Sequence, residues 1–180
     1  MMLHTLRSRR GFTLIELLAT IAILAILTSV VLAAVTASRQ KARDAKRVAE
    51  MNSIRKALEM YQQDRLSYPP TTPTGYAGAD AMLDSLSALG YLQSVPHPTL
   101  GTSYIYYGAA EMVTPTTECA TTEPCAGYVL ATPLERADHV GLTTDADVIT
   151  FTPAVGTFNG TTGDCLAGGV ATELCYDFNE

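Results

Sequence analysis

The longest apolar segment of the chain lies close to its N-terminus. Between Phe12 and Ser38 the only charged residue is Glu16. At about 1.5 Å per residue, a helix of this length extends about 40 Å, whereas the hydrocarbon core of a bilayer is about 30 Å thick. The pattern therefore predicts a membrane-spanning helix over residues 12–38.

The next segment, residues 39–67, is rich in charge but keeps a helical spacing of apolar positions. These positions are Ala45, Val48, Met51, Ile54, Leu58 and Tyr61. A recurrence every three or four residues predicts an amphipathic helix with one buried stripe. Pro69 and Pro70 should end this helix, because proline cannot continue the helical hydrogen-bond ladder. The buried stripe implies a head domain that packs on it.

Residues 68–180 are expected to form this head. Residues 71–79 are dominated by Gly, Pro, Thr and Ala without a visible period, which predicts a loop. A short helix should follow, with Asp80 as its N-cap and Gly90 as its stop. Its apolar positions are Met82, Leu83, Leu86 and Leu89.

After the short helix, the pattern changes to that of strands. Runs rich in aromatic and β-branched residues occur at 102–108, 127–135 and 147–153, with a last short run at 175–178. The predicted fold class is α+β, in which a long N-terminal helix packs against a small antiparallel sheet.

The composition and charge of the chain exclude some classes of function. The chain has 180 residues and a formal net charge of −6. Outside the apolar segment there is room for one modest domain, which excludes a large multidomain enzyme. Residues 12–67 contain eight basic and five acidic side chains, whereas residues beyond 67 contain thirteen acidic side chains and one basic, Arg136. Such an acidic head is a poor electrostatic match for phosphate, so we expect no nucleic-acid binding.

Glu16 requires an explanation, because a carboxylate in hydrocarbon is costly without a partner. A cleaved secretory signal peptide is one interpretation, since Val35–Ala37 resembles a small-residue cleavage site. The apolar run from Leu17 to Val35 is longer than the usual 7–15 residues or so of such a peptide. A plain single-span anchor is the second interpretation, but charges within membrane segments are rare and generally functional.

The stretch RRGFTLIELL, residues 9–18, supports a third interpretation. It resembles the prepilin leader motif of type IV pilins and type II secretion pseudopilins, which has a basic leader, then Gly, then Phe, then Glu four residues later. The resemblance implies that a prepilin peptidase cleaves between Gly11 and Phe12 and that Phe12 is then N-methylated. It also implies that Glu16 pairs with the amino terminus of a neighbouring subunit and so directs assembly.

The resemblance implies a domain organisation and a function. Residues 1–11 would be the leader, 12–38 the transmembrane and filament-core helix, 39–67 the amphipathic helix, and 68–180 the head. The chain would be a structural subunit of a type IV pilus or pilus-like filament, and not an enzyme. A pseudopilin of a type II secretion or DNA-uptake system is the nearest alternative. A membrane-anchored extracytoplasmic binding domain that never polymerises is the rival from another class.

The implied partners are identical or related pilin subunits, a prepilin peptidase, an inner-membrane assembly platform, and membrane lipid before assembly. The leader would lie in the cytoplasm and the head outside it, later in an extracellular or periplasmic filament. The number of basic residues alone favours the opposite orientation, because those that follow the apolar segment outnumber those before it. The residues compared are Arg39, Lys41, Arg43, Lys46 and Arg47 against Arg7, Arg9 and Arg10.

All four cysteines, Cys119, Cys125, Cys165 and Cys175, lie in the head. An even number in an acidic, extracytoplasmic head predicts two disulfides. Three pairings exist, and we favour the local one, Cys119 with Cys125 and Cys165 with Cys175. Zinc is disfavoured because neither pair has C-x-x-C spacing.

Asp145 and Asp147 form a candidate calcium loop in the stretch TTDADVIT, since calcium prefers oxygen ligands. Pseudopilins of the major type II secretion class bind calcium in this general region. Two carboxylates alone are few for such a site, and an acidic turn is the simpler interpretation. No other metal or cofactor is expected, and no motif typical of nucleophilic, phosphate-binding or dinucleotide-binding sites occurs.

Overall fold

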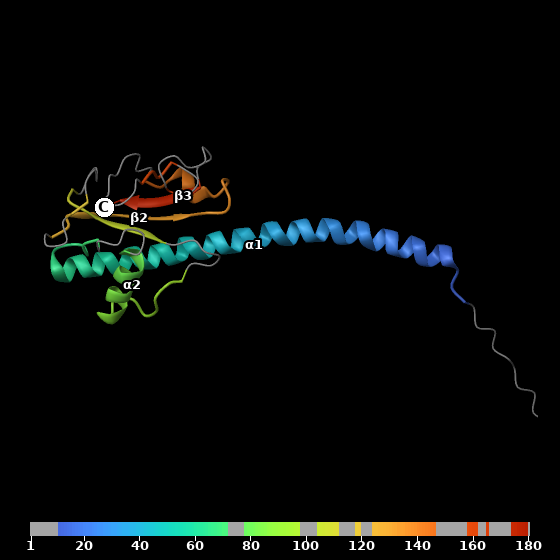
Figure 1. Cartoon of the computed structure of the whole chain (residues 1–180), viewed down its shortest axis with the longest axis horizontal. Coiled ribbons are helices and arrows are strands. Elements are labelled where there is room, and N and C mark those ends of the chain that lie inside the picture. The colour runs from blue at the N-terminus through green and yellow to red at the C-terminus, as the bar shows by residue number, and fades with distance from the viewer. Residues whose placement is uncertain are drawn as a thin grey trace, which may run out of the picture. The chain divides into compact units, whose positions relative to one another are not determined.

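The computed structural model describes residues 11–71, 78–97, 104–111, 118–119, 124–146, 158–161, 165 and 174–179. The chain forms two compact units, residues 1–39 and residues 40–180. In chain order, the elements are helix α1 (Leu14–Arg65), helix α2 (Gly78–Ala88), strand β1 (Ile105–Ala109), strand β2 (Gly127–Pro133), the 3-10 helix η2 (Val140–Thr143) and strand β3 (Cys175–Asn179) (Figure 1). The predicted α+β class is confirmed.

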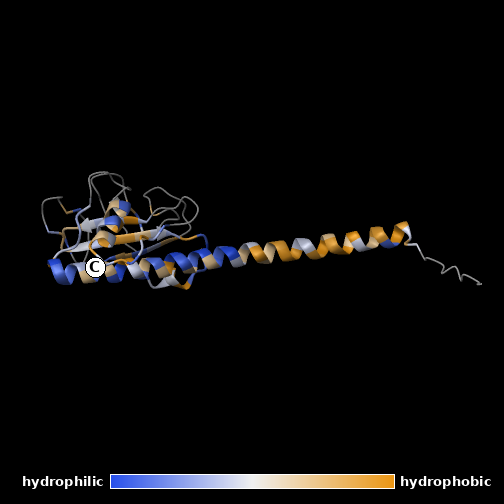
Figure 2. Ribbon diagram, turned by 90° about the horizontal axis from the view of Figure 1, so that it is seen from below, coloured by the Kyte–Doolittle hydropathy of each residue, from blue (hydrophilic) through white to orange (hydrophobic). Residues whose placement is uncertain are grey.

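Helix α1 contains both of the helices that the sequence predicts, without interruption. Figure 2 shows its N-terminal section mainly in hydrophobic colours and its C-terminal section mainly in hydrophilic ones. The helix ends at Arg65, and Leu66 follows with a φ of 57°, in the left-handed region. A left-handed residue commonly terminates a helix, and the prolines that follow prevent its continuation.

The three strands form one antiparallel sheet in the order β1-β2-β3. Ile105 of β1 lies opposite Ala131 of β2, and Val129 of β2 lies opposite Asn179 of β3. These strands agree with the runs predicted at 102–108, 127–135 and 175–178. The strand predicted at 147–153 falls outside the described residues.

The sheet buries both of its faces, because successive side chains of a strand point to opposite sides. One face carries Tyr104, Tyr106, Tyr128, Leu130 and Tyr176, which share a core cluster with residues of α1 and α2. The other face carries Ile105, Tyr107, Ala109, Val129 and Ala131, which cluster with Phe158, Cys165 and Cys175. This arrangement explains why every residue of β1 is buried.

Two details of the predicted helices are wrong. Ala45 of the predicted stripe is exposed, and the buried side chains at this level of α1 are Asp44 and Arg47. Helix α2 begins at Gly78, so Asp80 lies in its first turn and is not its N-cap. The predicted loop is correspondingly shorter, because burial of Ala79 in the core outweighs the loop-like composition.

A cluster of ion pairs joins α1 to the residues that follow β2. The Arg47 side chain is 2% exposed and donates from Nη1 to Asp44 Oδ1 at 3.2 Å and from Nη2 to Glu135 Oε1 at 3.1 Å. It also donates from Nη1 to the Pro133 carbonyl at 3.2 Å. Arg43 forms a bidentate pair with Glu135, and the Glu135 backbone N–H donates to Asp44 Oδ1 at 2.9 Å. These contacts compensate for the desolvation of the buried charges.

We expect the stability of the head to fall in acid because of Glu135. Hydrogen bonds from Arg43, opposed by partial burial, hold the pKa of Glu135 below its ordinary value of 4.5. A carboxyl with a lowered pKa contributes stability above its unfolded pKa, and this contribution is lost as the pH falls through the folded pKa. Thermal unfolding of the full chain in detergent, followed across the acid range, should show this loss below a pH of about 4.5.

The matched variant is Glu135→Gln, which should be less stable near neutral pH and should lose less stability on acidification. An unchanged dependence on pH in this variant would show that other carboxyl groups are responsible.

Two disulfides join residues close in the sequence, as the favoured pairing requires. Cys119 is bonded to Cys125, with Cα atoms 5.4 Å apart, and Cys165 is bonded to Cys175, with Cα atoms 5.1 Å apart. Gly108 of β1 packs directly against the first disulfide. A Cβ atom at Gly108 would lie 2.7 Å from Cys125 Sγ and 2.8 Å from both Cys119 Sγ and the Pro69 carbonyl oxygen.

The substitution Gly108→Ala should therefore destabilise the head, by about 1–3 kcal/mol if neighbouring groups shift to relieve the contact. Chemical or thermal unfolding of the oxidised chain measures the effect. Ala110→Ser, which adds one atom at an exposed position two residues away, is the control and should change stability little. Equal stability of the two variants would contradict the close packing under the disulfide.

Candidate assembly site at the N-terminus of helix α1

The peptide bond between Gly11 and Phe12 lies outside the helix. The first helical residue is Leu14, and residues 11–13 have no regular secondary structure. The side chain of Phe12 is 93% exposed. A protease binds its substrate most readily where the backbone is exposed and free of helical hydrogen bonds. The predicted processing position thus has an accessible geometry.

Glu16 lies in the first turn of α1 and is hydrogen-bonded to Thr13. The Thr13 backbone N–H and hydroxyl both donate to Glu16 Oε2, at 2.9 and 2.8 Å. In return, the Glu16 backbone N–H donates to Thr13 Oγ1 at 3.4 Å. This reciprocal arrangement is a capping box, with Thr13 as the N-cap, and it satisfies two backbone donors that a helix N-terminus leaves free.

The cap also gives Glu16 a favourable electrostatic position. The N-terminus of a helix carries a partial positive charge, which stabilises a nearby carboxylate. Within the described residues, no lysine, arginine or histidine forms an ion pair with Glu16. Both hydrogen bonds that its carboxylate accepts from Thr13 go to Oε2. The carboxylate is therefore held in a fixed position while Oε1 has room for a further donor.

The rest of the apolar section of α1 satisfies its own polar groups. Thr20, Thr28, Ser29 and Thr36 each donate a hydroxyl hydrogen bond to a carbonyl oxygen three or four residues earlier, at 2.7–3.0 Å. Such bonds remove the cost of placing a hydroxyl in hydrocarbon. Within the part of the chain that the structure describes, α1 is the one helix long and apolar enough to cross a membrane.

The apolar side chains of this section are exposed in the structure. They include Leu14, Ile15, Leu17, Leu18, Ile21, Ile23, Leu24, Ile26, Leu27, Val30, Val31 and Leu32. A soluble monomer rarely presents so many contiguous apolar side chains, and a surface of this kind marks contact with membrane or with other subunits.

The remaining candidate residues do not join this site. The four cysteines are all in disulfides and so are not free to bind zinc. Asp145 Oδ2 accepts a hydrogen bond from the Asp177 backbone N–H at 3.4 Å, and Asp147 lies outside the described residues. No group of three or more metal-binding side chains occurs among the described residues. The calcium loop stays a prediction.

The role of Thr13 was not predicted. The signature T-x-x-E is present at residues 13–16, but Glu16 was interpreted only as a charge in an apolar segment and as a partner for a neighbouring subunit. A capping box at the start of a helix is visible from sequence alone once the helix is known to begin at Leu14.

Comparison with known proteins agrees with this geometry. A family model described as the prokaryotic N-terminal methylation motif matches residues 6–32. The chain is 32% identical over 107 residues to the type II secretion system core protein G of Aeromonas hydrophila, a match that covers 54% of this chain and 72% of that protein. The corresponding protein of Escherichia coli is 31% identical over 108 residues, covering 57% of this chain and 74% of that protein.

A type IV pilus protein is also similar. The major component of the type IV wide pilus of Thermus thermophilus is 48% identical over 63 residues, which are 35% of this chain and 48% of that protein. No solved structure matches the chain significantly. Taken with the long apolar helix, its exposed surface and the α+β head, the matches show that the chain belongs to the family of type IV pilins and type II secretion pseudopilins.

Proposed function

We propose that the chain is a structural subunit of a type IV pilus or pilus-like filament, processed between Gly11 and Phe12 and assembled through α1. One observation carries the proposal. An accessible Gly-Phe bond directly precedes an exposed apolar helix, and the first turn of that helix holds a carboxylate, Glu16.

Processing would create a positively charged amino group on each subunit, which can pair with Glu16 of a neighbouring subunit. Hydrolysis of the Gly11–Phe12 bond leaves a carboxylate on Gly11 and an amino group on Phe12. The capping box already uses Glu16 Oε2 for hydrogen bonds within the chain. The amino group of a neighbouring subunit would bind through Oε1, so that the pair neutralises a charge that hydrocarbon disfavours. This requirement would favour assembly and fix the axial position of one helix against the next.

The head is proposed to lie outside the cytoplasm, first on a membrane-anchored subunit and then in a filament. The two disulfides support this topology, because structural disulfides persist in oxidising compartments. The family is one of structural subunits, and we assign the chain no catalytic activity.

A pseudopilin of a type II secretion or DNA-uptake system is the second candidate. The share of each relative that the chain matches favours this candidate. The match covers 72% of the type II secretion core protein G of Aeromonas hydrophila, but only 48% of the pilus protein. Both candidates use the same N-terminal chemistry. A filament visible on the cell surface would distinguish a pilus from a short periplasmic assembly.

Processing predicts a defined mass. In the membrane fraction or in sheared filaments, the chain should begin at N-methylated Phe12, and reduction should add two hydrogen atoms for each of the two disulfides. Intact-mass spectrometry with and without reduction checks both points. A full-length mass with Met1 retained and free thiols would contradict the processing and the topology, and would leave a plain anchored domain.

Assembly should depend on the charge of Glu16 and not only on its capping hydrogen bonds. Glutamine can accept the Thr13 N–H bond but carries no charge, so Glu16→Gln separates the two roles. We expect both Glu16→Ala and Glu16→Gln to lower the yield of sheared filament about tenfold or more, with processing still complete by mass. Thr13→Ala, which weakens the cap and retains the charge, should assemble better than either.

Wild-type yield from Glu16→Gln would show that the cap alone suffices. Wild-type yield from Glu16→Ala would exclude the pairing altogether.

A further inference from the structure

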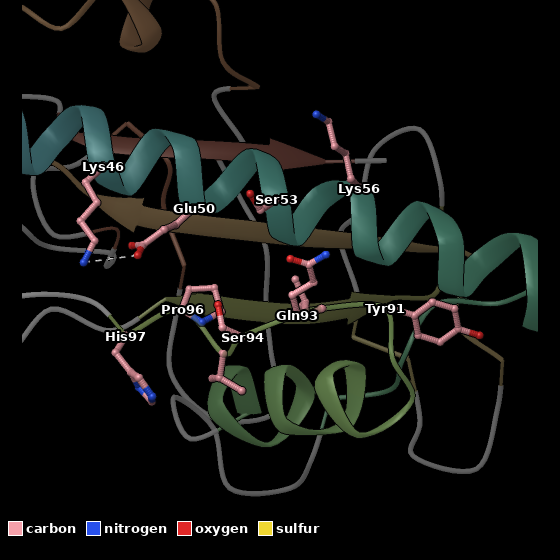
Figure 3. A pocket seen from close by; sticks show the side chains of 11 residues that line it. Lys46, Glu50, Ser53, Lys56, Tyr91, Gln93, Ser94, Pro96 and His97 are labelled. Atoms are coloured by element: carbon pink, nitrogen blue, oxygen red, sulfur yellow. Dashed lines mark ion pairs between the residues drawn. The ribbon is translucent and has the colours of Figure 1, made fainter.

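Two of the pockets within the unit of residues 40–180 border α1. In the larger one, between α1 and the segment 91–97, Lys46 Nζ lies 3.4 Å from Glu50 Oε1, so its charge is balanced within the chain (Figure 3). The smaller pocket has a volume of about 260 Å³. Its lining consists of Lys41, Arg136, Asp138, His139 and Val140.

The fold brings Lys41 and Arg136 to this smaller pocket from distant parts of the chain. The ion pairs of Glu135 with Arg43 and Arg47 hold the residues after β2 against α1. Arg136 directly follows Glu135 and is the only lysine or arginine beyond residue 67. The head thus has its single basic side chain beside the first lysine that follows the apolar section of α1.

The two cations of the pocket face one carboxylate. Arg136 donates to Asp138 through Nε at 2.8 Å and through Nη2, and neither bond uses Nη1. Hydrogen bonds from Arg136 hold the pKa of the Asp138 carboxyl below its ordinary value, and the charge of Lys41 acts in the same direction. The Lys41 side chain is exposed and forms no ion pair among the described residues. The pocket therefore has an excess of positive charge.

His139 supplies a further hydrogen-bond donor. The Gly141 backbone N–H donates to His139 Nδ1 at 3.0 Å. A ring nitrogen that accepts a hydrogen bond carries no proton, so the neutral imidazole has its N–H at Nε2. The donors of the pocket are then Lys41 Nζ, Arg136 Nη1 and His139 Nε2. Guanidinium and ammonium groups together are suited to the oxygens of a phosphate.

The position of the pocket along α1 indicates which phosphate it meets. Lys41 lies three residues beyond Ser38, where the apolar section ends, and three residues of helix extend about 4.5 Å. The headgroup layer is about 5–8 Å thick on each side of the hydrocarbon. Val140, which also lines the pocket, is 75% exposed. Basic and apolar side chains thus lie together at the level of the lipid headgroups.

We propose that this pocket binds the phosphate of an anionic phospholipid headgroup while the subunit is anchored in the membrane. The proposal rests on the proposed function, which anchors the subunit through α1. A zwitterionic headgroup has the same phosphate, but its ammonium group would be repelled by Lys41 and Arg136. Anionic lipid is therefore the preferred occupant.

The charge of the rest of the head makes this contact selective for one orientation. Beyond residue 67 the chain has thirteen acidic side chains and only Arg136 as a basic one. An anionic membrane repels such a surface, and it attracts the basic pocket. The contact would therefore hold the head in one orientation on the membrane. It must break when the subunit leaves the lipid and enters a filament.

A diazirine-bearing apolar amino acid in place of Val140 tests the proposal in the full chain. The chain is reconstituted in vesicles of equal parts phosphatidylglycerol and phosphatidylcholine, irradiated, and analysed by mass spectrometry for the attached lipid. We expect phosphatidylglycerol to be attached about fivefold more often, since each basic side chain near an anionic surface favours binding by a factor of about five.

Two variants test the pocket itself. Lys41→Gln should reduce the preference for phosphatidylglycerol to less than about twofold. Arg136→Gln/Asp138→Asn removes the guanidinium without changing the net charge, and it should also lower the preference. The control is Lys56→Gln, an exposed lysine of α1 outside this pocket, which should keep the full preference. Since a partly exposed ion pair contributes little to stability, all variants should keep both disulfides and their unfolding midpoint.

Inorganic phosphate distinguishes a lipid from a soluble anion. Lipid in the bilayer has a high effective concentration at the pocket, so phosphate should reduce attachment no more than sodium chloride of equal ionic strength. A selective loss with phosphate would overturn the proposal. Equal attachment of the two lipids, a full preference in either pocket variant, or an equal loss in Lys56→Gln would overturn it too.

These outcomes leave the proposed function intact, because intact mass and electron microscopy of cells report on processing and filaments independently. A lipid preference that depends on Lys41 and Arg136, in a chain that is neither cleaved after Gly11 nor found in filaments, would overturn the proposed function. It would leave the pocket as a lipid site of an anchored protein.

Discussion

The buried side chain of Arg47 fixes how the head is attached to its helix. Apolar contacts are non-directional, so Met51, Ile54 and Leu58 could pack against the sheet in more than one position. Arg47 reaches Glu135 and the Pro133 carbonyl in only one position of the helix. Sliding the helix by a turn would separate the buried Arg47 from Glu135 and the Pro133 carbonyl, and breaking a buried pair in this way costs about 3–5 kcal/mol. Within residues 40–180, this cluster therefore fixes the position of the sheet on α1.

The same constraint, that a polar group in apolar surroundings needs a partner, governs the N-terminus of α1. Four hydroxyls of the apolar section bond to carbonyl oxygens of their own helix, and Glu16 bonds to Thr13. The cap holds the carboxylate in place before a second subunit arrives. A group already ordered in its bound conformation loses less conformational entropy on binding. Thr13 thus stabilises the helix and prepares Glu16 for the proposed pairing.

Much of this fold could be predicted from periodicity, and the failures have physical causes. The stripe on α1 was predicted correctly at Met51, Ile54 and Leu58, whose burial follows from spacing alone. It was wrong at Ala45, because Asp44 and Arg47 are charged and appear solvent-exposed until Glu135, 88 residues from Arg47, is brought beside them. The local cysteine pairs needed no such long-range information.

The surroundings in which a charge pair forms decide what it contributes. A pair between Glu16 and an amino group would form in hydrocarbon, where no counterion screens it and where a missing partner is most costly. The ion pairs of Arg47 form within one chain, with Asp44 and Glu135. The first pair would therefore supply the drive to assemble and the axial position, whereas the pairs of Arg47 hold the sheet on α1 whether or not a filament forms.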